Sequence, residues 1–386
     1  MVPAWFFLVK ILAFDEVLGY DSCTRVHNQS GVLCRRMQDS KKNLTRRDIA
    51  ARAGVSPSTV SRALSGSSLL PRETIERVCA LASEMGYRPN ILARRLARNC
   101  SLQLGFVVRS GINGRGPFNM SYYSGMLDAV VQCAYGHGYT VSIQPVEEEL
   151  PGEAERLEEL VRSRELDGLI FLGLTKKSPL LSAGCLRGVP FVMLGSPSPL
   201  PRQRAVNFDH RQGIAEMLAK LSEFGYKRLF FVEGHPDYLD AGEQKKALLS
   251  LLPHTKVRLA EIIPGTYSQR SGWRAVEAIA SKLRRRDCVF LANDRMAAGF
   301  YRAAYEKGLK IPGDVGVVGC DDDELASIVF PELSTIRQPR GDMGRAAVEM
   351  LVGMLGKKSD ANISTRRIPG SFVLRKSLCK QCAAAK

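Results

Sequence analysis

Two kinds of hydrophobic pattern divide this chain. Between residues 44 and 87, apolar residues recur every three or four positions, as on the inward faces of short helices. From Leu102 onward, short runs of apolar and β-branched residues alternate with amphipathic helical stretches. The first pattern predicts a small all-helical domain, and the second predicts a larger α/β domain whose parallel strands are covered by helices.

Start and stop residues place the first two helices close together. Thr45, followed by Asp48, resembles a capping box, and Gly54 can end a helix in a left-handed turn. Ser56 is a suitable N-cap, and Pro57 fits the first position of the next helix. A third helix is expected over residues 72–84. Two short helices joined by a turn of this length are typical of a helix-turn-helix.

The remainder of the chain predicts two doubly wound halves with parallel sheets. Its expected strands are Leu104–Val108, Thr140–Ile143, Gly168–Leu172, Phe191–Leu194, Arg228–Glu233, Cys288–Leu291 and Gly316–Cys320. Its expected helices are Tyr122–Gly136, Ala154–Arg164, Gln212–Phe224, Ser271–Leu283 and Ala297–Lys307. More than one such alternating set over this length favours two sheets rather than one.

Charge strengthens the interpretation of the helical domain. The chain carries a net charge of +16, and residues 44–99 hold ten arginines against four acidic residues. Residues 100–386 hold 39 basic and 31 acidic side chains over about five times that length. Basic residues concentrated beside a helix-turn-helix favour a nucleic-acid partner over a membrane surface.

Several sequence blocks resemble the lactose-repressor (LacI-type) family of bacterial transcription regulators. The stretch 48–62 (DIAARAGVSPSTVSR) is similar to the family's helix-turn-helix, and 86–90 (GYRPN) to the start of its hinge helix. Further similar blocks follow at 206–213, 224–229, 291–299, 317–322 and 333–339, so that the resemblance covers about 44–378. It implies a periplasmic-binding-protein-like sensor of two subdomains with three chain crossings, a small-molecule ligand between them, and a homodimer.

Pattern and resemblance together predict the domain layout. Residues 1–43 are expected to be an extension, either disordered or translated from a start upstream of Met37. The helix-turn-helix domain spans 44–87, and a hinge helix and linker span 88–101. The sensor spans 102–378, with one subdomain at about 102–202 plus 338–365 and the other at about 203–337 plus 366–378. Residues 379–386 form a tail.

The second helix of the helix-turn-helix would enter the major groove of an operator. Its candidate DNA contacts are Ser56, Pro57, Ser58, Thr59, Ser61 and Arg62, with Thr45 and the hinge residues Asn90, Arg94 and Leu96 beside them. Arg62 can bind the O6 and N7 atoms of guanine, or alternatively a phosphate. The resemblance implies that Leu96 inserts between base pairs in the minor groove. Without the resemblance, Leu96 would be interpreted as a leucine that packs its helix.

The sensor residues implied by the resemblance lie near the ends of strands. They are Asp321, Asn293, Tyr267 and Gln244, with Phe118 and Tyr122 from the loop that follows the first strand. Asp321 could accept hydrogen bonds from ligand hydroxyls or amines. Each of these residues could instead be an ordinary cap or core residue. Gln244 stands where many members carry arginine, and Gly195 where sugar-binding members carry a carboxylate, so a common sugar is not directly implied.

Other function classes are disfavoured. The five histidines are dispersed, and no motif of a nucleophile with its base or of a phosphate-binding loop occurs, so no enzyme, cofactor or metal is expected. The single C-x-x-C at Cys379 and Cys382 is a weak metal signal and fits a frayed tail in a reducing cytosol. The apolar run 2–14 is too short to span a membrane and lacks a basic start. The sequence thus predicts a cytoplasmic regulator, most simply a repressor, with operator DNA, a copy of itself and a sugar, purine or related metabolite as partners. It leaves open whether the ligand releases DNA or promotes its binding.

Overall fold

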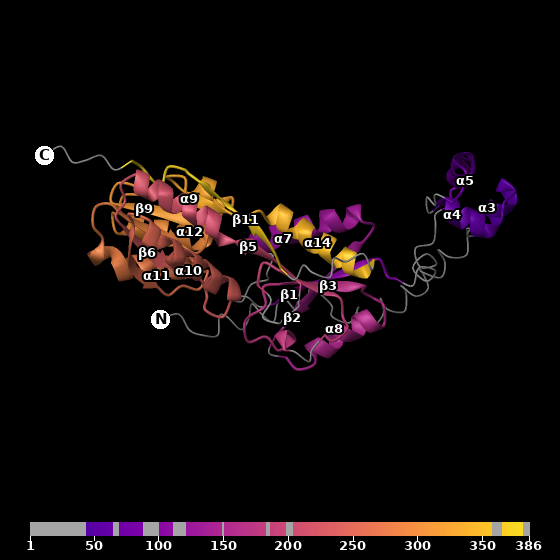
Figure 1. The fold of residues 1–386 in the computed structure, drawn as a ribbon, viewed down its shortest axis with the longest axis horizontal. Helices are drawn as coiled ribbons and strands as arrows, with labels where there is room; N and C mark the ends of the chain where they lie inside the picture. Colours follow the sequence, from indigo (N-terminus) through magenta and orange to yellow (C-terminus); the bar gives the residue numbers. More distant parts are fainter. Residues whose placement is uncertain are drawn as a thin grey trace, which may run out of the picture. The chain divides into compact units, whose positions relative to one another are not determined.

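A computed structural model of the chain describes residues 44–64, 69–87, 100–110, 121–148, 150–182, 186–197, 204–356 and 365–380. The chain divides into two units, with the boundary between Ala97 and Arg98. Among the described residues, the first unit contains three helices and the second contains two β-sheets with their covering helices (Figure 1). Each unit is described by itself below.

The first unit is a helix-turn-helix with a third supporting helix. Its elements are α3 (Arg46–Ala53), α4 (Pro57–Leu64) and α5 (Arg72–Glu84), which confirms the expected helix ranges. Gly54 ends α3 with a φ of 66°, in the left-handed region that glycine adopts at little cost. Ile49, Val60 and Val78 contribute one fully buried side chain from each helix. The three helices therefore share one small core.

The first sheet of the second unit is entirely parallel. Its strand order is β11-β5-β4-β3-β1-β2, from β1 (Gln103–Arg109), β2 (Thr140–Val146), β3 (Gly168–Leu172), β4 (Phe191–Leu194), β5 (Ala205–Asp209) and β11 (Thr365–Pro369). Helices α7 (Ser121–Gly136) and α14 (Arg340–Leu355) pack together over one face, where Phe106, Ile170 and Val192 join their core. Helix α8 (Glu153–Arg162) and the 3-10 turn η4 (Pro179–Leu181) cover the opposite face.

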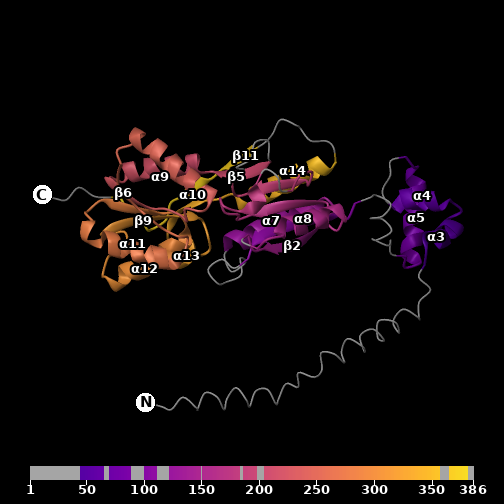
Figure 2. The ribbon, with the colours of Figure 1, turned by 90° about the horizontal axis from the view of Figure 1, so that it is seen from below.

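The second sheet has the order β12-β10-β9-β8-β6-β7, and only β12 runs antiparallel to its neighbour. Its strands are β6 (Arg228–Val232), β7 (Arg258–Ile263), β8 (Asp287–Leu291), β9 (Val315–Asp321), β10 (Ser334–Arg337) and β12 (Ser371–Val373). Helix α9 (His210–Glu223) packs with α10 (Leu239–Leu251), and α11 (Gln269–Ile279) packs with α12 (Asp294–Glu306). Figure 2 shows these pairs on opposite sides of β6 and β9, with the short α13 (Leu325–Ile328) beside α12. No helix in the described ranges is both long and apolar enough to cross a bilayer.

The chain passes between the two sheets three times, but two of the crossings lie later than expected. The stretch 205–209 pairs with β4 and β11 and is therefore the strand β5 of the first sheet. The first crossing consequently follows Asp209 instead of residue 202. The last crossing lies at Gly370, between β11 and β12, instead of at residue 365. Both corrections arise because β5 and β11 pair within the first sheet, where β5 lies between β4 and the edge strand β11.

Candidate functional site

Helix α4 presents a polar face to solvent. Ser56, Pro57, Ser58 and Arg62 are exposed, whereas Val60 and Ala63 on the opposite side are buried in the three-helix core. The Ser56 hydroxyl accepts a hydrogen bond from the backbone N–H of Thr59 at 3.1 Å and therefore caps the helix. Since the recognition helix of this motif reads bases with its N-terminal residues, the exposed face is the one that the motif uses.

Two of the expected DNA contacts also have local structural roles. The backbone N–H and the hydroxyl of Thr45 both donate to Asp48 Oδ2 at 2.7 Å, which fixes the start of α3. Ser61 accepts a hydrogen bond from Arg46 at 3.4 Å, linking α4 to α3. Both residues can still bind a phosphate, which orients a protein on DNA without reading its sequence. Asn90, Arg94, Leu96 and Phe118 lie outside the described residues.

A cavity of about 610 Å³ lies between the two sheets of the second unit. Its walls come from segments that follow β1, β3 and β4 on one side and β6, β7, β8, β9 and β10 on the other. These are the carboxyl ends of parallel strands, where open α/β sheets bind ligands. A cavity of this size suits a small metabolite.

Asp321, the last residue of β9, is a buried acid in the cavity wall. It is only 9% exposed, and its Oδ1 accepts a hydrogen bond from Gln338 Nε2 at 2.7 Å. Burial raises the pKa of Asp321 well above its usual range, the negative charge of Asp294 adds to the rise, and Arg340 opposes it. Burial thus disfavours the charged carboxylate, and a protonated Asp321 would offer ligand groups a donor as well as an acceptor.

A second buried acid, Asp294, supports this wall from behind. Its side chain accepts the Thr335 hydroxyl at 2.6 Å and the backbone N–H of Asp323 at 2.8 Å. Burial raises its pKa from 3.8 to about 7, while these two hydrogen bonds oppose the rise. Gly319 on β9 leaves the space that Asp294 occupies, since a Cβ there would collide with its carboxylate.

Three tyrosines of the cavity lie directly over glycines. Tyr122 covers Gly195, Tyr123 covers Gly173, and Tyr267 covers Gly234, so that a Cβ at any of these glycines would overlap a tyrosine side chain. Tyr238, which comes from the other subdomain, lies close enough to raise the pKa of Tyr123. The glycines, each just past a strand, therefore let the aromatic rings pack closely and hold them in place.

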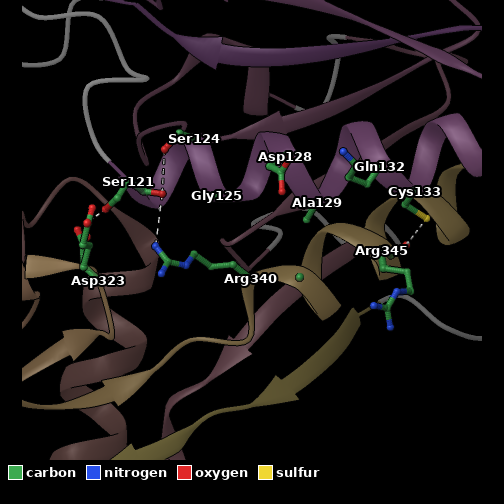
Figure 3. A pocket seen from close by; sticks show the side chains of 12 residues that line it. Ser121, Ser124, Gly125, Asp128, Ala129, Gln132, Cys133, Asp323, Arg340 and Arg345 are labelled. Carbon is green, nitrogen blue, oxygen red and sulfur yellow. Dashed lines mark hydrogen bonds between the residues drawn. The ribbon is translucent and has the colours of Figure 1, made fainter. Parts of the chain in front are cut away.

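Several contacts join the two subdomains around the cavity. The Ser121 hydroxyl at the start of α7 donates to the carboxylate of Asp323, which follows β9. Arg340, at the start of α14, donates to the Ser121 carbonyl at 3.4 Å and to the Asp322 carbonyl at 3.3 Å. Figure 3 shows Ser121, Asp323 and Arg340 at one end of the groove that α7 and α14 form on the surface. These contacts therefore link the two subdomains beside the cavity.

Comparison with known proteins gives two family matches. Residues 45–90 match the model of the bacterial regulatory proteins of the lacI family, and residues 218–378 match the periplasmic binding protein-like domain. The chain is 26% identical to catabolite control protein A of Priestia megaterium over 347 residues, which cover 87% of this chain and 99% of that protein. It is 28% identical to the ribose operon repressor of Escherichia coli (strain K12) over 314 residues, covering 80% and 92% of the two chains.

Solved structures agree with these sequence matches. The crystal structure of the Lac repressor dimer bound to operator and the anti-inducer ONPF has a TM-score of 0.70 and 26% identity, covering 88% of this chain and all of that one. The complex of the transcriptional regulator CelR with cellobiose has a TM-score of 0.65 and 26% identity, covering 86% and 99%. The chain belongs to the lacI family of bacterial regulatory proteins. It is a transcription regulator whose DNA binding responds to an effector, and its family is not one of enzymes.

The structure of this LacI-family regulator distributes the expected sensor residues unevenly. Tyr122, Tyr267, Asn293 and Asp321 line the cavity. Asn293 is also the N-cap of α12, because its Oδ1 accepts the Met296 N–H at 2.9 Å, as the alternative interpretation allowed.

Gln244 is not among the residues that line the cavity. It is buried on α10, and its Nε2 donates to the Ala292 carbonyl at 3.3 Å.

Among the cavity residues that were not foreseen from the sequence are Asp240 and Gln338. Asp240, in the first turn of α10, lines the cavity and pairs with His210 at 2.8 Å. Gln338 lines it after β10 and binds Asp321. A polar residue that follows a strand was the available signal in both cases. Asp240 was missed because neither the loop after β6 nor helix α10 was predicted from the sequence. Gln338 was missed because strand β10 was not predicted.

Proposed function

We propose that this regulator is a homodimeric repressor that binds a pseudo-palindromic operator through α4. When a small molecule occupies the cavity, the affinity for the operator falls or rises. The observation that carries the proposal is the cavity itself, which is enclosed by strand ends of both sheets in a chain that also holds a helix-turn-helix. A ligand that contacts both subdomains can bias their arrangement, which is what an effector must do to alter affinity at a separate site.

On the DNA side, the exposed face of α4 supports the assignment of Ser58 and Arg62 to base contacts and of Thr59 to a phosphate contact. Arg62 is exposed in the last turn of α4, where a guanidinium can reach the paired acceptors of guanine. For Leu96 the support is the resemblance alone, which assigns it to a wedge in the minor groove.

An exposed apolar cluster supports the homodimer. Phe330, Ile328 and Tyr305 are 90%, 65% and 86% exposed. They lie on neighbouring segments, because Tyr301, one turn before Tyr305 on α12, donates a hydrogen bond to the Pro331 carbonyl at 2.9 Å. Large apolar side chains gathered on one surface are typical of protein interfaces. The occupant we propose is a second copy of this chain, which would also give the two-fold symmetry of the operator.

On the effector side, we assign direct contacts to Asp321, Tyr122, Tyr267 and Asn293, which line the cavity. Similar proteins bind small molecules of several kinds: one structure holds cellobiose and another the anti-inducer ONPF. We therefore propose a sugar, a purine or a related metabolite as the effector class. In this family such regulators act in the cytoplasm, where we place this protein.

The test begins with selection of DNA from a random pool by the full-length protein. We expect a recovered sequence with two inverted half-sites, bound by a dimer in gel-shift and light-scattering measurements. Recovery of no preferred sequence, or binding by a monomer to one half-site, would contradict the proposal. Metabolites are then screened by thermal shift, since the stabilisation of the folded protein grows with the ratio of ligand concentration to dissociation constant.

Two substitutions at Asp321 separate a ligand contact from a structural role. Asparagine retains the donor and acceptor of a neutral acid, whereas alanine leaves Gln338 without its partner. We expect Asp321→Ala to weaken effector binding about 10- to 100-fold and Asp321→Asn to weaken it less. Ligand-free operator binding should be similar in both. Unchanged effector affinity in Asp321→Ala would remove this residue from the site.

A further inference from the structure

The chemistry of the cavity narrows the effector class beyond a sugar or a purine. Four tyrosines, which we call the tyrosine wall, form a contiguous surface: Tyr122, Tyr123, Tyr238 and Tyr267. Ring centroids are 5.6 Å apart for Tyr122 and Tyr123 and 6.1 Å apart for Tyr238 and Tyr267. Tyr123 and Tyr238 are close enough for Tyr238 to raise the pKa of Tyr123, which connects the two pairs. Such closely spaced electron-rich rings can surround a positive charge, as aromatic cages do.

Asp240 supplies a negative charge beside this wall. Its side chain is 25% exposed and lines the cavity, while His210 Nε2 donates to its Oδ1 at 2.8 Å. His210 is buried, and its Nδ1 has no hydrogen-bond partner among the described residues. A protonated ring would bury a second N–H without an acceptor, so the geometry fits the neutral tautomer. The ring then orients Asp240 without cancelling its charge.

The negative charge of Asp240 acts electrostatically on two residues of the tyrosine wall. It raises the pKa of Tyr122 and of Tyr267, in both cases after burial, which is the larger cause. It also contributes to the raised pKa of Asp321, whose own charge acts on the same two tyrosines. A ligand that reaches the wall is therefore exposed to a negative potential in surroundings that exclude much of the solvent.

Other charged groups around the cavity act on the same tyrosines: Arg340 lowers the pKa of Tyr122 by less than Asp240 raises it, and Arg109 lowers the pKa of Tyr123. Arg109 is paired with the buried carboxylate of Glu148 at 3.3 Å. Asp323 accepts the Ser121 hydroxyl and keeps its own negative charge nearby. Arg295, in the first turn of α12, also lines the cavity but comes from the segment after β8, whereas Asp240 follows β6. Asp240 and the tyrosine wall line the same cavity, and of the charges that act on Tyr122 the largest effect comes from Asp240.

We propose that the effector carries a positively charged amine, which Asp240 binds through a charge-assisted hydrogen bond beside the tyrosine wall. This inference rests on the proposed function, because it concerns the same cavity. An ammonium group donates up to three hydrogen bonds, and the carboxylate and the tyrosine hydroxyls can accept them. A neutral hydroxyl in the same position would gain less from both the carboxylate and the rings.

The test measures affinity for pairs of compounds that differ only in a positive charge. By calorimetry on the full-length protein we compare glucosamine with glucose, galactosamine with galactose, and 4-amino-1-butanol with 1,4-butanediol. At least one amine should bind about tenfold or more tightly than its neutral counterpart. The pair that responds distinguishes an amine on a sugar ring from a linear one. If no amine exceeds its counterpart, the proposal is wrong.

Matched variants locate the preference. Asp240→Asn should reduce the affinity for the amine roughly 10- to 100-fold, toward that of the neutral compound. Asp237→Asn removes the same charge three positions earlier, from a residue that does not line the cavity, and should leave the preference intact. An equal loss in both variants would contradict a direct contact with Asp240. If the effector that changes operator affinity is a neutral compound, the proposal of an amine is wrong but the proposed function stands. If no operator can be selected, the proposed function itself is wrong.

Discussion

Asp294 offers a direct test of the buried acids behind the cavity. Its side chain is fully buried, and the two hydrogen bonds that it accepts come from neutral donors, Thr335 Oγ1 and the Asp323 N–H. The substitution Asp294→Asn imitates the protonated acid, because the Thr335 hydroxyl can accept from the new amide as it would from a carboxyl hydrogen. We expect this variant to fold and to have a different dependence of stability on pH.

The magnitude follows from the pKa of Asp294, which rises from 3.8 in the unfolded chain to about 7 in the fold. Between these values the folded state binds more protons than the unfolded state, so stability falls as the pH rises. The contribution is fully present below the lower value and is lost as the pH passes through the upper one. A difference of about 3 pKa units corresponds to on the order of 4 kcal/mol. Above neutral pH, Asp294→Asn should therefore be more stable than the parent protein.

The assay is chemical denaturation of the effector-free protein from about pH 4 to about pH 8. The free energies of unfolding of the parent and of Asp294→Asn should nearly coincide at the acid end and separate as the pH rises. Asp287→Asn is the matched control, because Asp287 is equally buried but is held by Arg228 at 2.6 and 2.9 Å. That variant should lose stability, by roughly 1–3 kcal/mol given that Arg228 is partly exposed.

A difference between the parent and Asp294→Asn that does not change with pH would refute this reasoning. So would a variant that is less stable than the parent above neutral pH. Either result would mean that the Asp294 carboxylate is ionised at little cost in the fold, and that its surroundings are more polar than its hydrogen bonds indicate.

Three further predictions concern DNA binding and assembly. Arg62→Ala should weaken specific operator binding by about 1–3 kcal/mol in gel shifts and spare binding to random DNA; equal losses on both would make Arg62 a phosphate contact. If a dimer neutralises about 6–10 phosphates, operator affinity should fall roughly 10³- to 10⁵-fold between about 50 and 200 mM salt. An affinity that does not change with salt would contradict binding through the arginine-rich helical domain. Phe330→Asp should shift the protein toward monomers in light scattering, whereas a dimer of unchanged stability would place the interface elsewhere.

The helix-turn-helix could be predicted closely because its information is local. Thr45, Gly54, Ser56 and Pro57 mark helix starts and stops within a few residues, and the structure keeps each of those boundaries. Strands with continuous apolar runs, such as β3 and β4, were also predicted at their observed bounds. In both cases the pattern of a single segment is sufficient to identify the element.

Elements whose pattern depends on partners were missed. Strand β5 contains Asn207 and Asp209, and β7 contains Glu261, so neither reads as a clean apolar run. Helix α10 places its polar Gln244 in the buried interior and therefore lacks a clear amphipathic stripe. These segments adopt their structures because neighbouring strands and helices complete their hydrogen bonds and their cores, which one segment alone does not reveal.

The cavity could be predicted in outline but not in its charge. A strand that ends in polar residues indicates a site, and this was sufficient for Asp321. The sequence does not reveal that Asp294 lies behind Asp321, since that position requires the space left by Gly319, two residues earlier on the same strand. Nor does it reveal that the Tyr122 hydroxyl fills the position above Gly195, where sugar-binding relatives were expected to carry a carboxylate.

The segment after β9 connects the two halves of the effector site. Asp321 lines the cavity, and the next residues bind other elements: Asp322 pairs with Arg337 and Arg375, and its carbonyl accepts Arg340. Asp323 donates its N–H to Asp294 and accepts the Ser121 hydroxyl from the opposite subdomain. A ligand that displaces Asp321 must therefore move backbone that also holds the subdomains together. Asp322 is fixed by two arginines in its own subdomain. Such a movement should therefore break the contacts to Ser121 and Arg340 first, because these can open without breaking an ion pair.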